Sequence, residues 1–300
     1  MTQANAKLIQ PNAKLEKTIE GWLCGFVGML IFSGSLPATR TALAGFDPLF
    51  LTAARAVLAG TLALGVLLLF RQSRPSGKDI ASLAVVAFGV VLGFPLLSAL
   101  ALQHINAAQS QIFLGMMPLV TATFGVLRGG ERPRIWFWFF AFLGSVCVIS
   151  VALRHNMGLA KTGVGLMLAA ILVCGLGYAE GAKLARKLGG WQVICWALVL
   201  ALPFTIGLGC YTYPAHMAHI SRSVWLGLGY VSLFSMLIGF VFWYRGLALS
   251  GITTVGQLQL LQPGFGLIIS AIVLNETVPP LMIAVILGVM ICVLGAKRFA

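Results

Sequence analysis

Long apolar segments alternate with short polar connections along almost the whole chain. A helix needs about 20 largely apolar residues to cross the hydrocarbon core of a bilayer, and the pattern repeats that length ten times. We therefore predict an all-α polytopic membrane protein with ten transmembrane helices and no inserted soluble domain. The predicted spans are 21–43, 49–70, 80–101, 107–127, 135–153, 162–182, 191–212, 223–246, 253–274 and 279–296.

Composition agrees with this pattern and limits the chemistry. Of the 300 residues, 59% are hydrophobic and only 9% are charged, whereas soluble domains carry about 25% charged residues. Mean hydropathy is +0.98. Residues 1–20 are polar and are predicted to be a cytoplasmic tail. The six cysteines lie in apolar segments without a CxxC pair, so we expect small buried side chains and neither metal nor cofactor.

Lysines and arginines are distributed unevenly among the predicted connections. With the N-terminus placed inside, 15 of the 20 lie in cytoplasmic segments and four in external ones, and Arg55 lies within the second span. The positive-inside rule then predicts a multi-pass protein of the inner (plasma) membrane with both termini cytoplasmic. The net charge of +13 faces the anionic lipids of the inner leaflet. Nucleic-acid binding is not expected.

The two halves of the chain share a motif. Pro118 and Glu131 are 13 residues apart, as are Pro263 and Glu276, and the two pairs are offset by 145 residues. Each half contains five predicted spans, so the second half is expected to be inverted relative to the first. Inverted repeats are typical of secondary transporters, which bind substrate near the midplane between the repeats. The predicted repeats are residues 21–153 and 162–296.

Three segments carry a resemblance to a known family. They are "DPLFLTAARAVLAG" (47–60), "ALQHINAAQSQIFLGMMPLVTATFGVLRGGERP" (101–133) and "LQLLQPGFGLIISAIVLNETVPP" (258–280). With ten spans in a five-plus-five repeat, the sequence resembles the drug/metabolite transporter superfamily, and more narrowly its EamA-type exporters. Members of that family usually carry a Trp-Gly pair in the first span, where this chain has Phe32-Ser33.

The resemblance implies a secondary exporter that works by alternating access. Its pocket would be built from spans 1, 3, 4, 6, 8 and 9 in the family manner. Members export amino acids, nucleosides, other metabolites and drugs, so the fold alone does not choose the substrate.

The end of the first span, "FSGSLPATR", is polar for a membrane helix. Ser33 and Ser35 offer hydroxyl groups to a polar solute, and Pro37 is predicted to kink the helix and free a carbonyl toward the pathway. The alternative is that the small residues here serve close helix packing.

Two charged residues lie within predicted spans. Arg55 is a candidate for binding a carboxylate or stabilising an open state, although its depth of about 10 Å also allows snorkelling to the outer headgroups. Glu180 is a candidate for binding a substrate ammonium group or a coupling proton. Its alternative role is a local pair with Lys183, three positions further along the helix.

Polar side chains in the ninth span are the strongest candidates for pocket groups. Gln259 and Gln262 are three residues apart, so they share a helix face just before Pro263, whereas Gln257 points elsewhere. Amides in a membrane helix are costly without partners. Tyr178 is a candidate aromatic wall of the cavity. The weaker counterparts in the fourth span are Gln111, Met117 and Pro118.

Some residues in connections have predicted roles outside the pocket. Glu131 and Glu276 follow helix ends and are expected to cap helices or make gating contacts. His216 and His219 form an H-x-x-H pair, but a zinc site needs three or four ligands and no further ligand is nearby in the sequence.

The leading hypothesis is a secondary transporter that exports a small amphipathic metabolite, an amino acid or a related compound. The nearest alternative is a multidrug or organic-cation exporter, and a non-transport membrane subunit is less favoured. Seven acidic residues, six of them in loops, tails or span ends, leave little for an intramembrane enzyme. The sequence leaves energy coupling and oligomeric state open.

Overall fold

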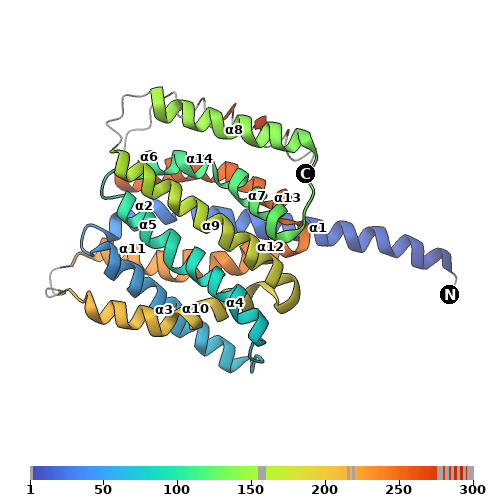
Figure 1. Cartoon of the computed structure of the whole chain (residues 1–300), viewed down its shortest axis with the longest axis horizontal. Coiled ribbons are helices and arrows are strands. Elements are labelled where there is room, and N and C mark those ends of the chain that lie inside the picture. Colours follow the sequence, from blue (N-terminus) through green and yellow to red (C-terminus); the bar gives the residue numbers. More distant parts are fainter. Residues whose placement is uncertain are drawn as a thin grey trace.

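The computed structural model describes the backbone of residues 3–154, 160–214, 217 and 220–275, with seven single positions beyond (280, 284, 287, 288, 291, 292 and 295). Side chains are described for the same positions except 3–14 and 147–154. Every regular element in this part of the chain is a helix (Figure 1). Most of the predicted tenth span, together with Glu276, His216 and His219, lies outside the described residues.

The first half of the chain forms nine helical segments in the order of the predicted spans. They are α1 (Gln3–Ser33), α2 (Ser35–Ala42), α3 (Pro48–Leu69), α4 (Gly77–Val86), the π-helix η1 (Ala87–Gly93), α5 (Phe94–Ala101), α6 (Ala107–Leu114), α7 (Met117–Gly129) and α8 (Ile135–Arg154). The described part of the second half continues with eight more. They are α9 (Lys161–Leu188), α10 (Gly190–Tyr211), α11 (Arg222–Gly229), the π-helix η2 (Tyr230–Ile238), α12 (Gly239–Ser250), α13 (Ile252–Gly256), the 3-10 helix η3 (Gln257–Leu261) and α14 (Gln262–Leu274).

Among the described residues, eight helical stretches are long and apolar enough to cross a membrane, and a shorter apolar stretch, Ile135–Val146, lies in α8. The multi-pass prediction is therefore confirmed, while ten spans stay a prediction. Helix α1 (Gln3–Ser33) continues without a break from the predicted N-terminal tail into the first span.

Local backbone features recur in the two halves at an offset close to 145 residues. The third and eighth predicted spans are both interrupted by a π-helix, η1 and η2. Helices α7 and α14 both begin with a proline in their first turn and end at a residue with positive φ, Gly130 (69°) and Asn275 (53°). Pro fits a first helical turn and Gly or Asn fits a left-handed cap. The same sequence signals therefore build the same local structure twice.

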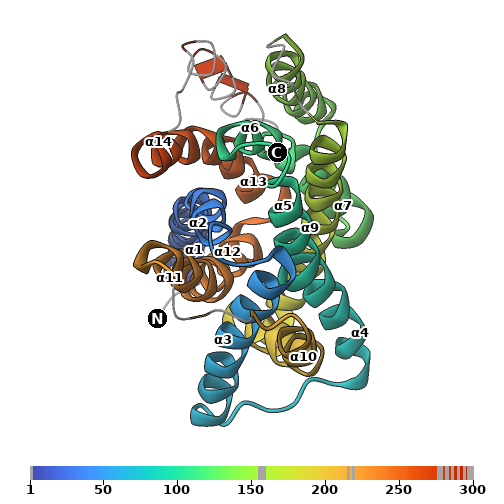
Figure 2. The same ribbon diagram turned by 90° about the vertical axis from the view of Figure 1, so that its left-hand side faces the viewer.

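The spans pack closely where glycines face one another. A Cβ atom on Gly246 of α12 would lie 2.7 Å from the Gly25 nitrogen of α1, and one on Gly28 would lie 3.0 Å from the Trp243 nitrogen. Small residues let membrane helices approach at backbone distance. Figure 2 shows the result: α1 and α12 lie side by side near the middle of the bundle, with α8 at the periphery and α3 beside α10 on the far side.

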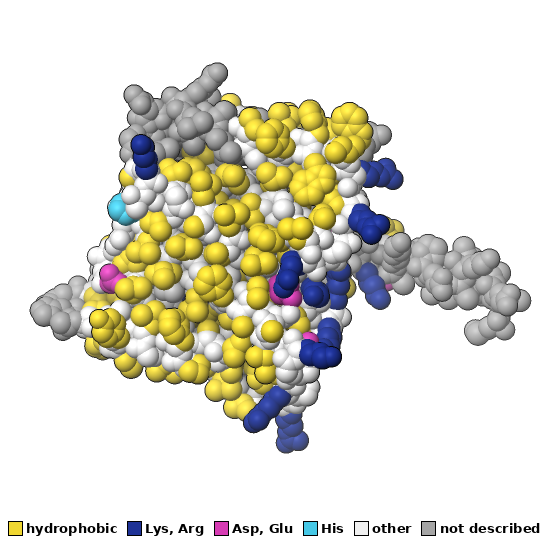
Figure 3. All heavy atoms as spheres, viewed as in Figure 1, with side chains coloured by type: hydrophobic (Ala, Val, Ile, Leu, Met, Phe, Trp, Pro, Cys, Tyr) yellow, Lys and Arg dark blue, Asp and Glu magenta, His cyan; other side chains and the backbone are white. Residues whose placement is uncertain are grey.

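Basic side chains gather at one end of the bundle, the end from which the N-terminal helix projects (Figure 3). We call this the basic end. It is formed by the last turns of α7 and α9 and the first turns of α4 and α13, which salt bridges and hydrogen bonds join directly. The last turn of α12 lies at the same end and is joined to α1 through Ser250 and Thr18 O. The remaining surface of this view is largely apolar, as a protein embedded in lipid requires.

Candidate functional site

The first span is interrupted at the position that its sequence predicts. Helix α1 ends at Ser33, Gly34 forms a turn, and α2 begins at Ser35. Pro37 has no N–H, so it cannot donate to the carbonyl four residues earlier, that of Ser33. A Cβ on Gly34 would lie 2.5 Å from the Tyr230 hydroxyl, so glycine is needed for this close approach.

Side chains from other spans bind the backbone carbonyls at this break. Gln111 Nε2 of α6 donates to Ser33 O (3.2 Å), and Gln262 Nε2 of α14 donates to Phe32 O (3.4 Å). The Tyr230 hydroxyl of η2 donates to Ile31 O (2.8 Å). Gln111 and Gln262, both predicted as pocket residues, therefore meet at the same segment from two sides.

The predicted serines are hydrogen-bonded within the protein. Ser33 Oγ donates to Met29 O (2.9 Å) in its own helix, and Ser35 Oγ lies 2.6 Å from Ser235 Oγ of η2. Pro37 lies away from both, in an apolar groove of about 330 Å³ that also contacts Thr41 and Tyr230. The first span thus contributes backbone carbonyls and the Phe32 ring to the centre of the bundle more than hydroxyl groups.

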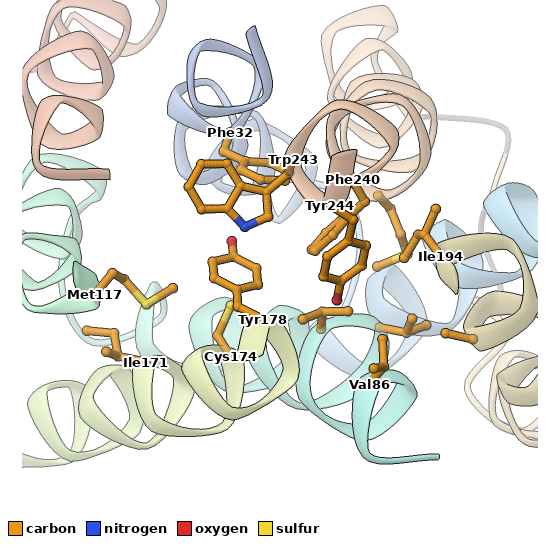
Figure 4. Packing of buried hydrophobic residues seen from close by; sticks show 14 of the residues in the cluster. Phe32, Val86, Met117, Ile171, Cys174, Tyr178, Ile194, Phe240, Trp243 and Tyr244 are labelled. Atoms are coloured by element: carbon orange, nitrogen blue, oxygen red, sulfur yellow. The ribbon is translucent and has the colours of Figure 1, made fainter. Parts of the chain in front are cut away.

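Five aromatic rings from three spans form a buried group at the break, which we call the aromatic cluster. Its members are Phe32 of α1, Tyr178 of α9 and Phe240, Trp243 and Tyr244 of α12. Ring centroids lie 4.9 Å apart for Phe32 and Phe240, 5.4 Å for Tyr178 and Trp243, and 6.3 Å for the stacked rings of Phe32 and Tyr178. In Figure 4 the Trp243 indole nitrogen points toward the Tyr178 hydroxyl.

Amide groups of the ninth span adjoin the aromatic cluster. Gln259 Oε1 accepts from Thr121 Oγ1 of α7 (3.3 Å). Gln262 binds the Phe32 carbonyl beside the aromatic cluster, and the role of both amides as pocket groups stays a prediction.

Several buried polar atoms in this region have no hydrogen-bond partner among the described residues. They are Gln111 Oε1, Trp243 Nε1, Gln259 Nε2 and both polar atoms of the Gln257 side chain. A buried polar atom without a partner costs about 1–3 kcal/mol. Donors and acceptors kept at that cost beside aromatic rings can bind a solute that has both polar and apolar parts.

The remaining predicted pocket residues flank the same region. Met117, 2% exposed, begins α7 and lies beside the aromatic cluster in Figure 4. Pro118 and Pro263 occupy the first turns of α7 and α14. A Cβ on Gly266 would lie 2.2 Å from the Gln111 side chain, so this glycine makes room for Gln111.

Arg55 of α3 is buried without a carboxylate. The side chain is 5% exposed, and its Nη2 donates to Val231 O (3.2 Å) and Ser235 Oγ (3.4 Å) of η2. Its Nε has no partner among the described residues. The guanidinium is therefore held between the second and eighth spans and does not snorkel to the surface.

Glu180 of α9 is fully buried near the basic end and contacts two other spans and one residue of its own helix. It accepts from Arg128 of α7 (2.9 Å) and Ser82 of α4 (2.6 Å), and lies 3.7 Å from Lys183. The expected Lys183 pair exists, but the shorter contacts come from spans that the sequence does not identify. Its charge is balanced by protein cations.

Glu131 caps a helix of the other half. Its two oxygens accept from the backbone N–H groups of Ile252 and Thr253 (both 2.7 Å), the first residues of α13, and from Arg186 of α9 (2.9 Å). An acidic group at a helix N-terminus satisfies free N–H groups and complements the helix dipole. The prediction of a capping contact is confirmed for Glu131.

Sequence reasoning missed Phe240, Trp243 and Tyr244, although "GFVFWYRG" places four aromatic residues near the end of one span. It also assigned no role to Ser235, Arg128 or Thr121. The described residues contain no group of three or more His, Cys, Asp or Glu arranged to hold a metal ion.

These features define a polytopic membrane protein with a buried aromatic and amide site between helices of both halves. The EamA-like transporter family model matches residues 19–153 and again 161–296, so the chain belongs to that family, within the drug/metabolite transporter superfamily.

Known proteins resemble the chain over almost its full length. The uncharacterized transporter YdeK of Bacillus subtilis is 59% identical over 286 residues, 95% of this chain and 100% of that protein. A probable terminal-alkyne amino-acid exporter of Streptantibioticus cattleyicolor is 25% identical over 84% of this chain and 85% of its own. A solved crystal structure has the same fold, with a TM-score of 0.72 at 18% identity, over 93% of this chain and 97% of that one.

Proposed function

We propose that this protein is a secondary transporter that exports a small amphipathic metabolite, an amino acid or a related compound, across the inner or plasma membrane. The observation that carries the proposal is the buried site at the break in the first span. It combines aromatic rings with unpartnered amide and indole atoms, and its residues come from both halves of the chain. The name of the amino-acid exporter among the relatives supports the same substrate class.

The proposed mechanism is alternating access between two inverted five-helix repeats, ten helices in all. Both termini and the basic end would face the cytoplasm and the anionic inner leaflet. Because the aromatic cluster is buried, a solute reaches it only when one end of the bundle opens. Glu131 and Glu180 join helices across the basic end, so opening this end requires their contacts to break.

The alternative substrate class, organic cations, would need an acidic group free to bind them. Glu180 already accepts from Arg128 and Ser82, which weakens that reading. Protons stay a candidate coupling ion through the same carboxylate.

Counterflow in proteoliposomes tests the proposal. Vesicles loaded with an excess of one unlabelled solute receive a trace of the labelled solute, in parallel for amino acids, nucleosides and cationic dyes. We expect accumulation with amino acids. Accumulation with dyes alone would replace the proposal by the multidrug alternative, and accumulation with nucleosides alone would reassign the substrate class.

Two variants test whether the solute binds at the aromatic cluster and its neighbouring amides. Trp243→Phe removes an unpartnered N–H and keeps the ring, and Gln259→Leu removes the amide. If these atoms bind the solute, we expect its apparent affinity to fall about 10-fold, the loss of one to two hydrogen bonds. Phe142→Leu, at a side chain 61% exposed on α8, is the matched control and should transport normally.

A further inference from the structure

Among the described residues, no carboxylate pairs with the buried guanidinium of Arg55. Six of the seven acidic residues are described, and none of them lies within 4 Å of Arg55 in a salt bridge. Its two contacts, Val231 O and Ser235 Oγ, are neutral. A charged side chain inside a membrane is costly and almost always faces a partner or a pathway. Arg55 therefore has unused capacity to bind an anion.

The neighbours of Arg55 lie in the first and eighth spans, which also carry four of the five members of the aromatic cluster. Ser235 Oγ, which accepts from Arg55, lies 2.6 Å from Ser35 Oγ, the first residue after the break in the first span. Ser235 and Phe240 are five residues apart along η2 and α12, which corresponds to about 7 Å along a helix. One small amphipathic molecule can span that distance.

The backbone segment that contacts the Arg55 guanidinium is a π-helix. Residues 230–238 form this element, which is rare and often found at functional sites. Val231 O, in this segment, accepts from Arg55. A planar guanidinium with a free Nε–H, beside the Ser35 and Ser235 hydroxyls, is suited to a carboxylate because it can donate two parallel hydrogen bonds.

We propose that Arg55 binds the carboxylate of the transported solute, with Ser35 and Ser235 as neighbouring hydroxyl groups and the aromatic cluster holding the apolar part. This inference rests on the proposed function and narrows its substrate class to molecules that carry a carboxylate. It assigns the specificity of the site to a residue of the second span, outside the six spans that the family resemblance places around the pocket.

Thermal unfolding of the purified, full-length protein in detergent tests this assignment without transport. The probes are L-phenylalanine, L-phenylalaninamide, which lacks the carboxylate, and 3-phenylpropionate, which keeps it and lacks the amine. The native protein should be stabilised by both carboxylates and much less by the amide. Arg55→Met should weaken binding of the carboxylates about 10- to 100-fold, Arg55→Lys should weaken it less, and binding of the amide should not change.

The unfolding temperature of Arg55→Met without ligand is a second readout. If Arg55 served only to stabilise the fold, this temperature would fall. Replacing a buried, unpaired charge by an apolar side chain of similar length is neutral or stabilising, so Arg55→Met should unfold at the same or a higher temperature than the native protein. Arg222→Met, which removes an exposed cation at the first turn of α11, is the matched control and should alter neither stability nor selectivity.

Several outcomes would overturn the assignment. One is that ligand-free Arg55→Met unfolds at a lower temperature and still binds carboxylates. Another is that phenylalanine and its amide stabilise the native protein equally. A third is that neither carboxylate stabilises the native protein. Stabilisation by phosphatidylglycerol alone, lost in Arg55→Met, would assign the site to a lipid phosphate instead. Carboxylate binding without amino-acid counterflow would contradict the proposed function but would still support carboxylate binding at Arg55.

Discussion

The two ends of the bundle are held together by different chemistry. At the basic end, carboxylates and cations from different spans pair directly: Glu180 with Arg128, Glu131 with Arg186, and Asp79 with Lys187 (2.7 Å). At the opposite end, Ser235 Oγ contacts the side chains of Ser35 and Arg55, and three further contacts between spans join cations or a hydroxyl group to backbone carbonyls. They are Arg40 with Leu102 O, Arg55 with Val231 O and Tyr230 with Ile31 O.

This difference suits the two ends to different roles, closure of the pathway and recognition of the solute. The cations of the basic end are 41–60% exposed in these three pairs, so water can replace the ionic contacts when the end opens. The contacts of Arg55 at the opposite end are buried and neutral, which leaves the Arg55 charge for a ligand. We interpret the basic end as a closure and the opposite half as the side that recognises the solute's charge.

The largest effect is expected from Arg128→Met. It leaves the buried Glu180 carboxylate with Ser82 and a distant Lys183, which should lower the free energy of unfolding by about 1–3 kcal/mol and favour opening of the basic end. Cys174, 1% exposed beside Tyr178, reports on opening. In a version that keeps Cys174 as its single cysteine, an impermeant maleimide applied at the basic end should label Arg128→Met several-fold faster.

Lys183→Met is the matched control for this change, because Lys183 lies on the same helix as Glu180 but at 3.7 Å and 56% exposed. It should alter labelling little. Equal labelling rates in the Arg128→Met and native proteins would contradict the interpretation of this pair as part of a closure.

A smaller effect is expected from Glu131→Ala. The variant leaves two backbone N–H groups of α13 without their acceptor, and losing a helix N-cap costs about 0.5–2 kcal/mol. Amide hydrogen exchange of Ile252 and Thr253 should accelerate, and Cys174 labelling from the basic end should rise. Glu131→Gln keeps one carbonyl oxygen and should show about half the loss of stability.

Asp47→Ala separates capping from closure. Asp47 caps α3 through Leu49 N (2.8 Å) but joins no second span in the described residues. Its loss should lower stability by a similar amount and leave Cys174 labelling unchanged. A rise in labelling equal to that of Glu131→Ala would show that stability alone controls access.

Much of the fold could be predicted because its signals are local. Span lengths, the break near Pro37 and the paired Pro–Glu motifs each depend on residues close together in sequence, and the structure has the corresponding helices, the turn at Gly34 and the Glu131 cap. The family model also matches twice, as the repeat predicts.

The partners within the site could not be predicted, because they depend on how distant spans pack. Glu180 and Arg128 are 52 residues apart, and Gln262 and Phe32 are 230 apart. Gln257, which the sequence places on another helix face than Gln259 and Gln262, is also fully buried, and its side chain has no partner in the described residues. A single sequence carries no signal for such contacts.

The smallest effect is expected from Tyr230→Phe at the opposite end. It removes the hydrogen bond to Ile31 O (2.8 Å) and keeps the ring, which stacks on Phe234 with centroids 5.6 Å apart. The loss should be about 0.5–1.5 kcal/mol, the net worth of one neutral hydrogen bond. Because this bond joins the break in the first span to η2, Cys174 labelling should rise from the opposite side only. Tyr213→Phe, at an exposed ring of the same end, should change neither the stability nor the Cys174 labelling. Faster labelling of Tyr230→Phe from the basic end would contradict the proposed difference between the two ends.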